Sequence, residues 1–392
     1  MMLFEAMQHF LNTPFPLLHT QFSETERKRA IQTFQALRQA EEILSQMSEY
    51  ERLSQEEGGI LAQQALTLSE REDIDEEFRF VPHQVLENIA NAVPGALRGL
   101  YPRFLQRDFS YGMEALFREA DSDTRDQLIL WIENEEKTVY LRDQLLSLLA
   151  WIDDEVVLKA FHRWRDNPPA WVEFLPQSVE WFPLVAGWEL TADGNKRNLY
   201  YSTNYRLIPS DLQRSEQAEP VEMILPHEER CGWCHRSFVT LFDLQLSDRR
   251  LSFLSLQGER LRIAICPNCS QQDCQVITDI DMQGGSQWSA SSGEAPERLH
   301  LYADTMLEKM TLPSRPLVLG SPHRTPFVSE GSHLGGCPGW VHYPEYPQCP
   351  QCQQTMTFLG QYEPDGVPYI EGIFFAFLCA DCGKATTVYQ QT

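Results

Sequence analysis

The cysteines constrain this chain more than any other feature. Eight of its ten cysteines form four Cys-x2-Cys pairs, "CGWC", "CPNC", "CPQC" and "CADC". A Cys-x2-Cys on a tight turn directs two sulfurs to one point, and a second such turn completes a tetrahedral four-thiolate zinc site. In chain order the pairs predict two structural Zn²⁺ sites, the first made by Cys231, Cys234, Cys266 and Cys269, the second by Cys349, Cys352, Cys379 and Cys382.

The residues around the two predicted sites resemble each other. "RSFVTLFDL" follows the first pair of one site, and "QTMTFLGQ" follows the first pair of the other. "LRIAICPNC" and "IFFAFLCADC" carry the second pairs, and each spacer (235–265 and 353–378) has room for a β-hairpin that brings its ends together. We therefore predict an internal duplication of turn, strand, loop, strand and turn. A thioredoxin-like redox site is disfavoured, because it needs one Cys-x2-Cys between a strand and a helix.

Two cysteines and three histidines remain as alternative ligands. Cys274 follows closely on the first site, and Cys337 lies in "LGGCPGW", where we expect a turn with Trp340 in the core. We expect both cysteines to be buried free thiols. His235, His333 and His342 are expected to be ordinary surface or core residues rather than ligands.

The first 168 residues show helical patterns. "FSETERKRAIQTFQALRQAEEIL" begins with Ser23 and Glu26 at capping-box spacing. Later helices of 10 to 13 residues follow one another across short acidic turns, and Val157, Phe161 and Trp164 form one apolar stripe. This pattern predicts a HEAT-like helical repeat, with a plain helical bundle as the alternative.

The residue pattern changes from helical to β-rich after "RDNPPAW", where two prolines end the last helix. Short β-rich runs separated by Gly, Pro, Asn and Asp follow. We predict an α+β chain in four parts: a helical domain at 1–168, a β-rich domain with the first zinc unit at 169–282, a flexible Gly/Ser-rich linker at 283–299, and a β-rich domain with the second zinc unit at 300–392.

The net charge of the chain limits the kinds of molecule that it is expected to bind. The chain has 56 acidic and 32 basic residues and a formal net charge of -24. That excess repels phosphate backbones, and residues 349–392 contain a single basic residue, so a nucleic-acid partner is not expected. A basic protein partner is favoured, and acidic residues at two places are candidate contacts, with an ordinary solvated face as the alternative. These residues are Glu70, Glu72, Asp73, Asp75, Glu76, Glu77, Asp153 and Asp154.

Several classes of protein are not expected. No apolar run reaches the roughly 18 residues that span a bilayer. "MMLFEAMQHFLNTPFPLLHT" has no positively charged start, so we expect a cytoplasmic chain whose cysteines stay reduced. The sequence has no phosphate-binding glycine loop, no His-Glu-x-x-His and no Gly-x-Ser-x-Gly, so an enzyme is not expected.

The C-terminal stretch resembles two related families. "HLGGCPGW", "CPQC", "MTFLGQYE" and "FFAFLCADC" occur in that order. They resemble the C-terminal region of the YwqG-like bacterial proteins, and they are similar to programmed cell death protein 2 and its relatives. The resemblance covers roughly residues 331–392 and, more weakly, the first cysteine unit. The helical half lies outside it.

These families imply protein binding rather than catalysis. The bacterial relatives occur in toxin–immunity gene neighbourhoods, and the eukaryotic relatives act as chaperones for a basic ribosomal protein. The resemblance therefore implies a cytosolic immunity protein that occludes a basic toxin, such as a nuclease effector. A zinc-containing chaperone or adaptor for a basic cellular protein is the alternative.

Overall fold

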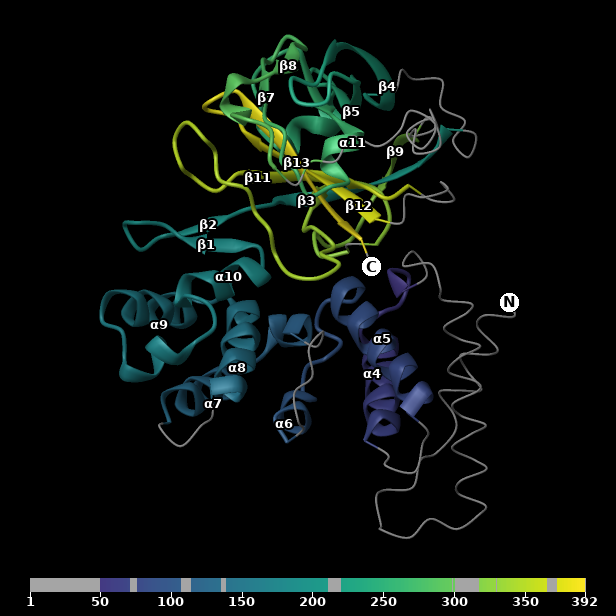
Figure 1. Ribbon diagram of the computed structural model, residues 1–392. Helices are drawn as coiled ribbons and strands as arrows, with labels where there is room; N and C mark the ends of the chain where they lie inside the picture. Colours follow the sequence, from purple (N-terminus) through teal and green to yellow (C-terminus); the bar gives the residue numbers. More distant parts are fainter. Residues whose placement is uncertain are drawn as a thin grey trace, which may run out of the picture. The chain divides into compact units, whose positions relative to one another are not determined.

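The computed structural model is an α+β chain with an all-α first part and antiparallel sheets after it (Figure 1). Its described residues are 50–70, 76–106, 114–134, 139–210, 220–297, 299, 317–328, 330–364 and 372–391. The chain divides into two compact units, one of residues 1–186 with 190–196 and one of residues 187–189 with 197–392. Within the described residues, no helix combines the length and the apolar character needed to cross a bilayer.

The first unit is helical, as predicted. Its elements are α4 (Gln55–Ser69), α5 (Glu76–Ala92), α6 (Tyr101–Phe104), η1 (Glu114–Glu119), α7 (Ser122–Glu133), α8 (Val139–Ile152), α9 (Glu155–Asp166), η2 (Ala170–Phe174), η3 (Val179–Trp181) and α10 (Phe182–Val185). Consecutive helices pack together, α4 on α5 and α7 on α8. Such packing is common to a helical repeat and a bundle, the two alternatives that the sequence leaves open. The predicted helix after Ser23 lies outside the described residues.

Side-chain caps and one apolar stripe explain why these helices form where they do. Ser54 makes a reciprocal capping box with Glu57 at the start of α4. The predicted stripe of α9 is confirmed, because Val157, Phe161 and Trp164 are all buried. Phe161 meets Trp164 edge to face with ring centroids 5.5 Å apart, which favours this packing beyond the buried area alone.

The second unit is built from two antiparallel sheets, and β1 (Trp188–Leu190) and β2 (Lys196–Asn198) form a hairpin where the chain changes unit. One sheet has the order β4-β5-β6, and the other has the order β8-β7-β13-β12-β11-β10-β3-β9. The strands are β3 (Tyr201–Pro209), β4 (Val221–Arg230), β5 (Ser237–Gln245), β6 (Arg260–Ile265), β7 (Thr278–Ile280), β8 (Ser286–Trp288), β9 (Leu317–Pro322), β10 (His333–Gly336), β11 (Thr357–Tyr362), β12 (Gly372–Cys379) and β13 (Lys384–Gln391). One apolar core contains residues from both sheets, including Phe242, Leu261, Leu359 and Phe374.

Strand register confirms the internal duplication. In the first cysteine unit Val239 pairs with Ile265, and in the second Thr357 pairs with Leu378, at the same positions relative to the cysteines. The next pairs correspond in the same way: Thr240 with Ala264 against Phe358 with Phe377, and Asp243 with Arg262 against Gln361 with Phe375. Each first hairpin strand also carries an irregularity at the same place, between Thr240 and Phe242 in β5 and between Phe358 and Gly360 in β11. The two units therefore share one local fold.

The Gly-Gly stretch is a strand rather than the turn that the sequence predicts. His333–Gly336 forms β10, which pairs with both β3 and β11. Gly335 has φ +76, and a Cβ there would lie 2.1 Å from the carbonyl oxygen of Thr203. The strand therefore needs glycine at this position, because the neighbouring backbone approaches so closely.

The domain boundaries differ from the predicted ones. The helical unit continues past 168 to 186, and both cysteine units belong to one compact unit. The predicted linker at 283–299 contains β8 and the short helix η6 (Ala290–Ser292). β7 pairs with both β8 and β13, so this segment joins the sheet of the second cysteine unit. Pairing between segments about a hundred residues apart leaves no local trace in a Gly/Ser-rich sequence.

Candidate metal centres

The first Cys-x2-Cys turn of each unit has the same backbone hydrogen bonds. The N–H of His235 donates to the carbonyl of Cys231 at 2.8 Å, and that of Cys231 donates to Arg236 at 2.8 Å. In the second cysteine unit the N–H of Gln353 donates to the carbonyl of Cys349 at 2.8 Å, and the N–H of Cys349 donates to the carbonyl of Gln354 at 2.8 Å. His235 and Gln353 both have left-handed backbone, with φ 59 and 61. This reversal of the chain places both cysteine sulfurs of each pair on one side of the turn.

The second turn of each unit follows the second hairpin strand. Cys266 directly follows β6 and is the N-cap of α11 (Pro267–Ser270), where the N–H of Ser270 donates to the Cys266 carbonyl at 3.0 Å. Cys379 is the last residue of β12, and Gly383, with φ 61, turns the chain into β13. The hairpin register brings each second turn beside the first.

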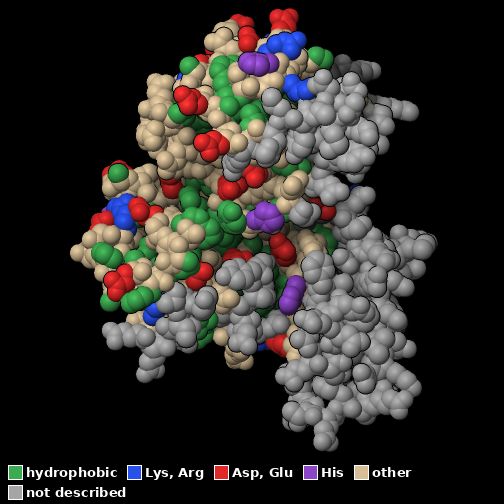
Figure 2. Space-filling view, in the orientation of Figure 1, with side chains coloured by type: hydrophobic (Ala, Val, Ile, Leu, Met, Phe, Trp, Pro, Cys, Tyr) green, Lys and Arg blue, Asp and Glu red, His purple; other side chains and the backbone are tan. Residues whose placement is uncertain are grey.

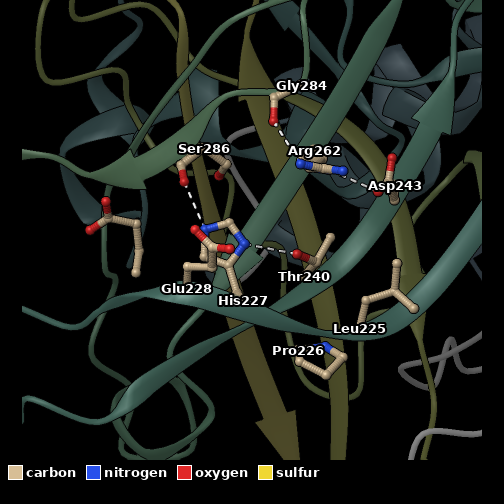
Figure 3. Close-up of a pocket in the computed structure, with 10 residues that line it drawn as sticks. Leu225, Pro226, His227, Glu228, Thr240, Asp243, Arg262, Gly284 and Ser286 are labelled. Carbon is tan, nitrogen blue, oxygen red and sulfur yellow. Dashed lines mark hydrogen bonds and ion pairs between the residues drawn. The ribbon is translucent and has the colours of Figure 1, made fainter.

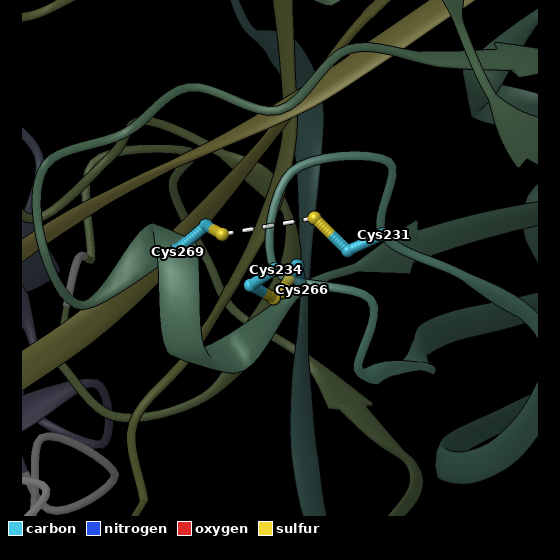
Figure 4. A group of neighbouring side chains, drawn as sticks. All are labelled: Cys231, Cys234, Cys266 and Cys269. Carbon is cyan, nitrogen blue, oxygen red and sulfur yellow. Dashed lines mark hydrogen bonds between the residues drawn. The ribbon is translucent and has the colours of Figure 1, made fainter. Parts of the chain in front are cut away.

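The eight predicted ligands form two separate groups of four. In each group the four sulfur atoms lie within 4.8 Å of one another. The sulfurs of Cys231 and Cys269 are 3.7 Å apart, and those of Cys234 and Cys266 are 3.4 Å apart (Figure 4). In the second group the sulfurs of Cys352 and Cys379 are 3.8 Å apart.

These distances fit a tetrahedral metal site. Four sulfurs at the usual zinc–sulfur bond length of about 2.3 Å would stand about 3.8 Å from one another. The three separations given above, 3.4 to 3.8 Å, lie close to that value, and every sulfur of a group lies within 4.8 Å of the others. Both groups can therefore hold a metal ion with four protein ligands and no open position.

The two groups differ in burial. Cys231, Cys266 and Cys269 are completely buried beside Phe238 and Val276, and only Cys234 is partly exposed. In the second group Cys349 is buried, Cys379 and Cys382 are partly exposed, and Cys352 is exposed. Solvent therefore reaches the second centre more easily than the first.

Hydrogen bonds around the sulfurs shift the thiol pKa values in opposite directions. The side-chain contact with Cys231 lowers the pKa of Cys234, whereas the same neighbour raises that of Cys266. Burial would raise the pKa of Cys349, but backbone N–H groups of Cys352 and Gln351 hold it below its usual value. A metal binds the thiolate form, so its binding would release the protons that these groups share.

The remaining cysteines and histidines lie outside the two groups, as expected. Cys274 and Cys337 are buried, and neither takes part in a disulfide. His333 is a fully buried core residue whose Nδ1 lies 2.9 Å from the carbonyl oxygen of Gly335. His342 bonds the Gln391 carbonyl through Nε2 at 2.8 Å. His235 instead shapes the first cysteine turn through its left-handed backbone.

The described acidic candidates for partner contact have roles within the helical unit. Glu70 forms an ion pair with Arg103, and Asp153 forms one with Lys196. Asp154 caps α9 by accepting from the N–H groups of Val156 and Val157. Glu72, Asp73 and Asp75 lie outside the described residues, as do the side chains of Glu76 and Glu77, which begin α5. In Figure 2 acidic side chains are scattered over the visible described surface rather than gathered there.

The structure also contains a polar pocket that the sequence analysis did not identify. It has a volume of about 410 Å³ and lies on the β4-β5-β6 sheet, walled on one side by Gly284 and Ser286 (Figure 3). Its other lining residues are Leu225, Pro226, His227, Glu228, Glu229, Thr240, Asp243 and Arg262. In the sequence, only the alternation of buried and exposed positions in "ILPHEER" of β4 hinted at this surface. Strand register brings the lining side chains together.

Comparison with known proteins gives one similar sequence. The Salmonella typhimurium protein described as uncharacterized protein YpfL is 34% identical over 285 residues, which cover 70% of this chain and 64% of YpfL. The chain thus spans less than two thirds of the length of that relative, and the description of YpfL names no activity. No protein-family model matches the chain, and no solved structure matches it.

Proposed function

We propose that this chain holds two structural Zn²⁺ ions and works as a cytoplasmic binding protein for a basic protein. The observation that carries the proposal is the pair of four-sulfur groups. A tetrahedral metal with four thiolates has no position for a substrate, so its role is to hold the hairpins together rather than to catalyse. Soft thiolates at tetrahedral geometry select zinc or iron, and of these two we propose zinc.

Metal analysis tests the first half of this proposal. Purified protein should contain two zinc equivalents per chain by elemental analysis and should be colourless. Fewer than one equivalent of any metal would contradict the proposal. Visible absorption with iron in place of zinc would keep the structural role but replace the metal.

Charge supports the class of partner. A net charge of -24 accelerates encounter with a basic protein and disfavours nucleic acid. The family resemblance around residues 331–392 adds the finer proposal that the partner is a toxin, such as a nuclease effector, whose active site the chain occludes. The ion pairs of Glu70 and Asp153 make these two residues weaker contact candidates than exposed carboxylates elsewhere.

A chaperone or adaptor for a basic cellular protein is the second candidate. One observation favours it: residues that carry the resemblance to programmed cell death protein 2 also contact one another. Trp340 packs on Phe375 and Phe377, and Gln361 accepts a hydrogen bond from the N–H of Gly339 at 2.8 Å. Trp340, Phe375 and Phe377 pack in one cluster with Cys349, Cys379 and Cys382 of the second metal centre.

Co-expression separates the two candidates. The chain should rescue a cell that produces the toxin encoded by a neighbouring gene, and it should form a one-to-one complex with that toxin. The association rate should fall as salt rises, because charges separated by more than about 10 Å are screened at 0.1 M. Failure of rescue, with ribosomal proteins captured in pull-downs, would replace the immunity proposal with the chaperone one.

A further inference from the structure

The two cysteine units contain equivalent pairs of close sulfurs. In each unit the pair joins the last cysteine of the first turn to the first cysteine of the second turn. The sulfurs of Cys234 and Cys266 are 3.4 Å apart in the first unit (Figure 4), and those of Cys352 and Cys379 are 3.8 Å apart in the second. The two copies of the local fold therefore hold the same two thiols in different surroundings.

Two tryptophans shield the pair of the first unit. Trp233 lies between the cysteines of the first turn, and its ring meets Trp288 edge to face with centroids 5.3 Å apart. Trp288 also lies against the turn itself, because a Cβ on Gly232 would come within 2.4 Å of its ring. Both tryptophans pack against the apolar cluster that contains Cys266, which is completely buried, and Cys234 is only partly exposed.

The pair of the second unit lies at the surface. Cys352 is exposed and Cys379 is partly exposed. The neighbours of Cys352 in the chain, Gln351 and Gln353, are exposed as well, and so are residues 380 and 381. Of the eight ligands Cys352 alone is exposed, so a small oxidant dissolved in water reaches this sulfur most easily.

We propose that the second metal centre is a redox-sensitive site, at which hydrogen peroxide or another hydroperoxide joins Cys352 to Cys379 as a disulfide and so releases the metal. The first centre keeps its metal under the same conditions. The inference deepens the proposed function, because it adds regulation to a centre that the proposal treats as structural, and it rests on the presence of that metal.

The reaction uses two thiolates and one peroxide. The Cys352 thiolate attacks one oxygen of the peroxide, the O–O bond breaks and hydroxide leaves, which gives a sulfenic acid. The Cys379 thiolate then attacks the Cys352 sulfur, the S–O bond breaks and a second hydroxide leaves. The two sulfurs lose two electrons in total, and the peroxide gains them.

The geometry of the second unit suits this step. A disulfide bond is about 2.0 Å long, so the sulfurs of Cys352 and Cys379 must approach by roughly 1.8 Å. Because both turns lie at the surface, rotation of the side chains can supply much of that movement. Cys349 and Cys382 then remain as two ligands, fewer than the four that hold a structural zinc ion.

Release of the metal should also disturb an aromatic cluster. Trp340 packs on Phe375 with ring centroids 4.8 Å apart and stacks on Phe377 at 5.9 Å. Cys379 packs against the same cluster and follows Phe377 by two residues on β12. Movement of Cys379 toward Cys352 therefore acts on the strand that supports Trp340, and the fluorescence of this tryptophan should report the oxidised state.

Zinc release from the whole, metal-loaded chain tests the proposal. Hydrogen peroxide should release one zinc equivalent at least tenfold faster than the second, measured with a colorimetric indicator against a sample without peroxide. Peptic digestion in acid, where disulfides do not exchange, should give a disulfide between Cys352 and Cys379 by mass spectrometry. Dithiothreitol with added zinc should restore both equivalents and the original tryptophan fluorescence.

Three results in this experiment would overturn the proposal. The first is release of both equivalents at equal rates. The second is a disulfide in the first unit that forms before the one between Cys352 and Cys379. The third is oxidation of Cys352 to a sulfinic acid that dithiothreitol does not reverse.

A variant tests whether the tryptophan cover protects the first unit. Trp288→Ala should speed release of the slower zinc equivalent by peroxide at least fivefold, and an unchanged rate would overturn the argument from burial. Trp181→Ala removes a half-buried tryptophan from the helical unit and should leave both rates unchanged. Each variant must hold two zinc equivalents before oxidation. If Trp288→Ala does not, the wild-type release rates and disulfide map decide alone.

Metal content separates this inference from the proposed function. Two zinc equivalents that peroxide releases equally would overturn the redox-sensitive site and leave the structural centres standing. A chain purified under reducing conditions without zinc would contradict the proposed function. If peroxide still joined Cys352 to Cys379 in that zinc-free chain, the reactive thiol pair would stand, and if it did not, both proposals would fall.

Discussion

Asp243 and Arg262 form an ion pair across β5 and β6, with the carboxylate buried and the guanidinium Nε 2.8 Å away. In the second cysteine unit the same positions are occupied by Gln361 and Phe375. One local fold thus carries a charged pair in one copy, and a neutral amide opposite an aromatic ring in the other. The two copies share the hairpin and differ in the chemistry of these paired positions.

Asp243→Ala should destabilise the β-rich unit. The substitution leaves Arg260 and Arg262 without their buried acceptor, and the loss of a charge-assisted hydrogen bond costs about 1.5–3 kcal/mol. Urea unfolding followed by tryptophan fluorescence measures the change. Glu294→Ala, at an exposed position outside the pocket, is the control and should change stability by less than about 0.5 kcal/mol. An unchanged midpoint for Asp243→Ala would mean that the pair does not stabilise the sheet.

The two metal centres should lose metal at different rates. Cys352 is exposed whereas Cys231 is buried, so a chelator reaches the second centre first. Metal release to a colorimetric chelator should show a fast and a slow phase of one equivalent each. Cys352→Ser should abolish the fast phase alone, and Cys231→Ser the slow phase alone. A single phase in the wild-type protein would show that burial does not control release.

Gly335→Ala should destabilise the β-rich unit by more than about 1 kcal/mol. The new Cβ would clash with a backbone carbonyl, and the left-handed φ is itself unfavourable for alanine. Gly331 provides the matched control, since it has φ +70 and nothing within 4 Å of the added Cβ. Gly331→Ala should lose only the stability that the left-handed backbone costs a residue with a Cβ, without a steric clash. Thermal unfolding of both variants measures the difference, and equal losses would show that the strand relaxes away from Thr203.

Stability should fall in acid partly through His333. Burial lowers the pKa of His333 to about 3, below the usual value of 6.5. Between these values the unfolded chain binds a proton and the folded chain does not, so stability is lost as pH falls below about 6.5 and is unaffected above it. One proton contributes a slope of about 1.4 kcal/mol per pH unit.

Comparison with His333→Gln isolates this contribution. Denaturant unfolding between pH 7 and pH 4, at fixed zinc concentration, should show a shallower pH dependence in the variant than in wild type. The pKa of His323 is also lowered to about 3, mainly by burial, and that residue remains in both proteins. Parallel curves would mean that His333 does not bind a proton differently in the two states.

Local spacing made the metal centres predictable. Cysteines two residues apart share a turn whatever the rest of the chain does, and the repeated flanking pattern identified which turns belong together. The structure assembled these eight residues as the sequence predicted. The stripe of Val157, Phe161 and Trp164 was readable for a similar reason, because helical periodicity fixes which side chains share a face.

Tertiary structure alone decided the rest. β7 and β8 join β13 across about a hundred residues, so the segment at 283–297 reads as a linker and folds as part of a sheet. Glu70 and Asp153 look like free charges in the sequence, and their ion pairs come from residues distant along the chain. The pocket combines β4, β5, β6 and the turn before β8, so its charge balance depends on strand pairing. Periodicity and spacing record local geometry, whereas long-range pairing is set by the packing of the whole unit.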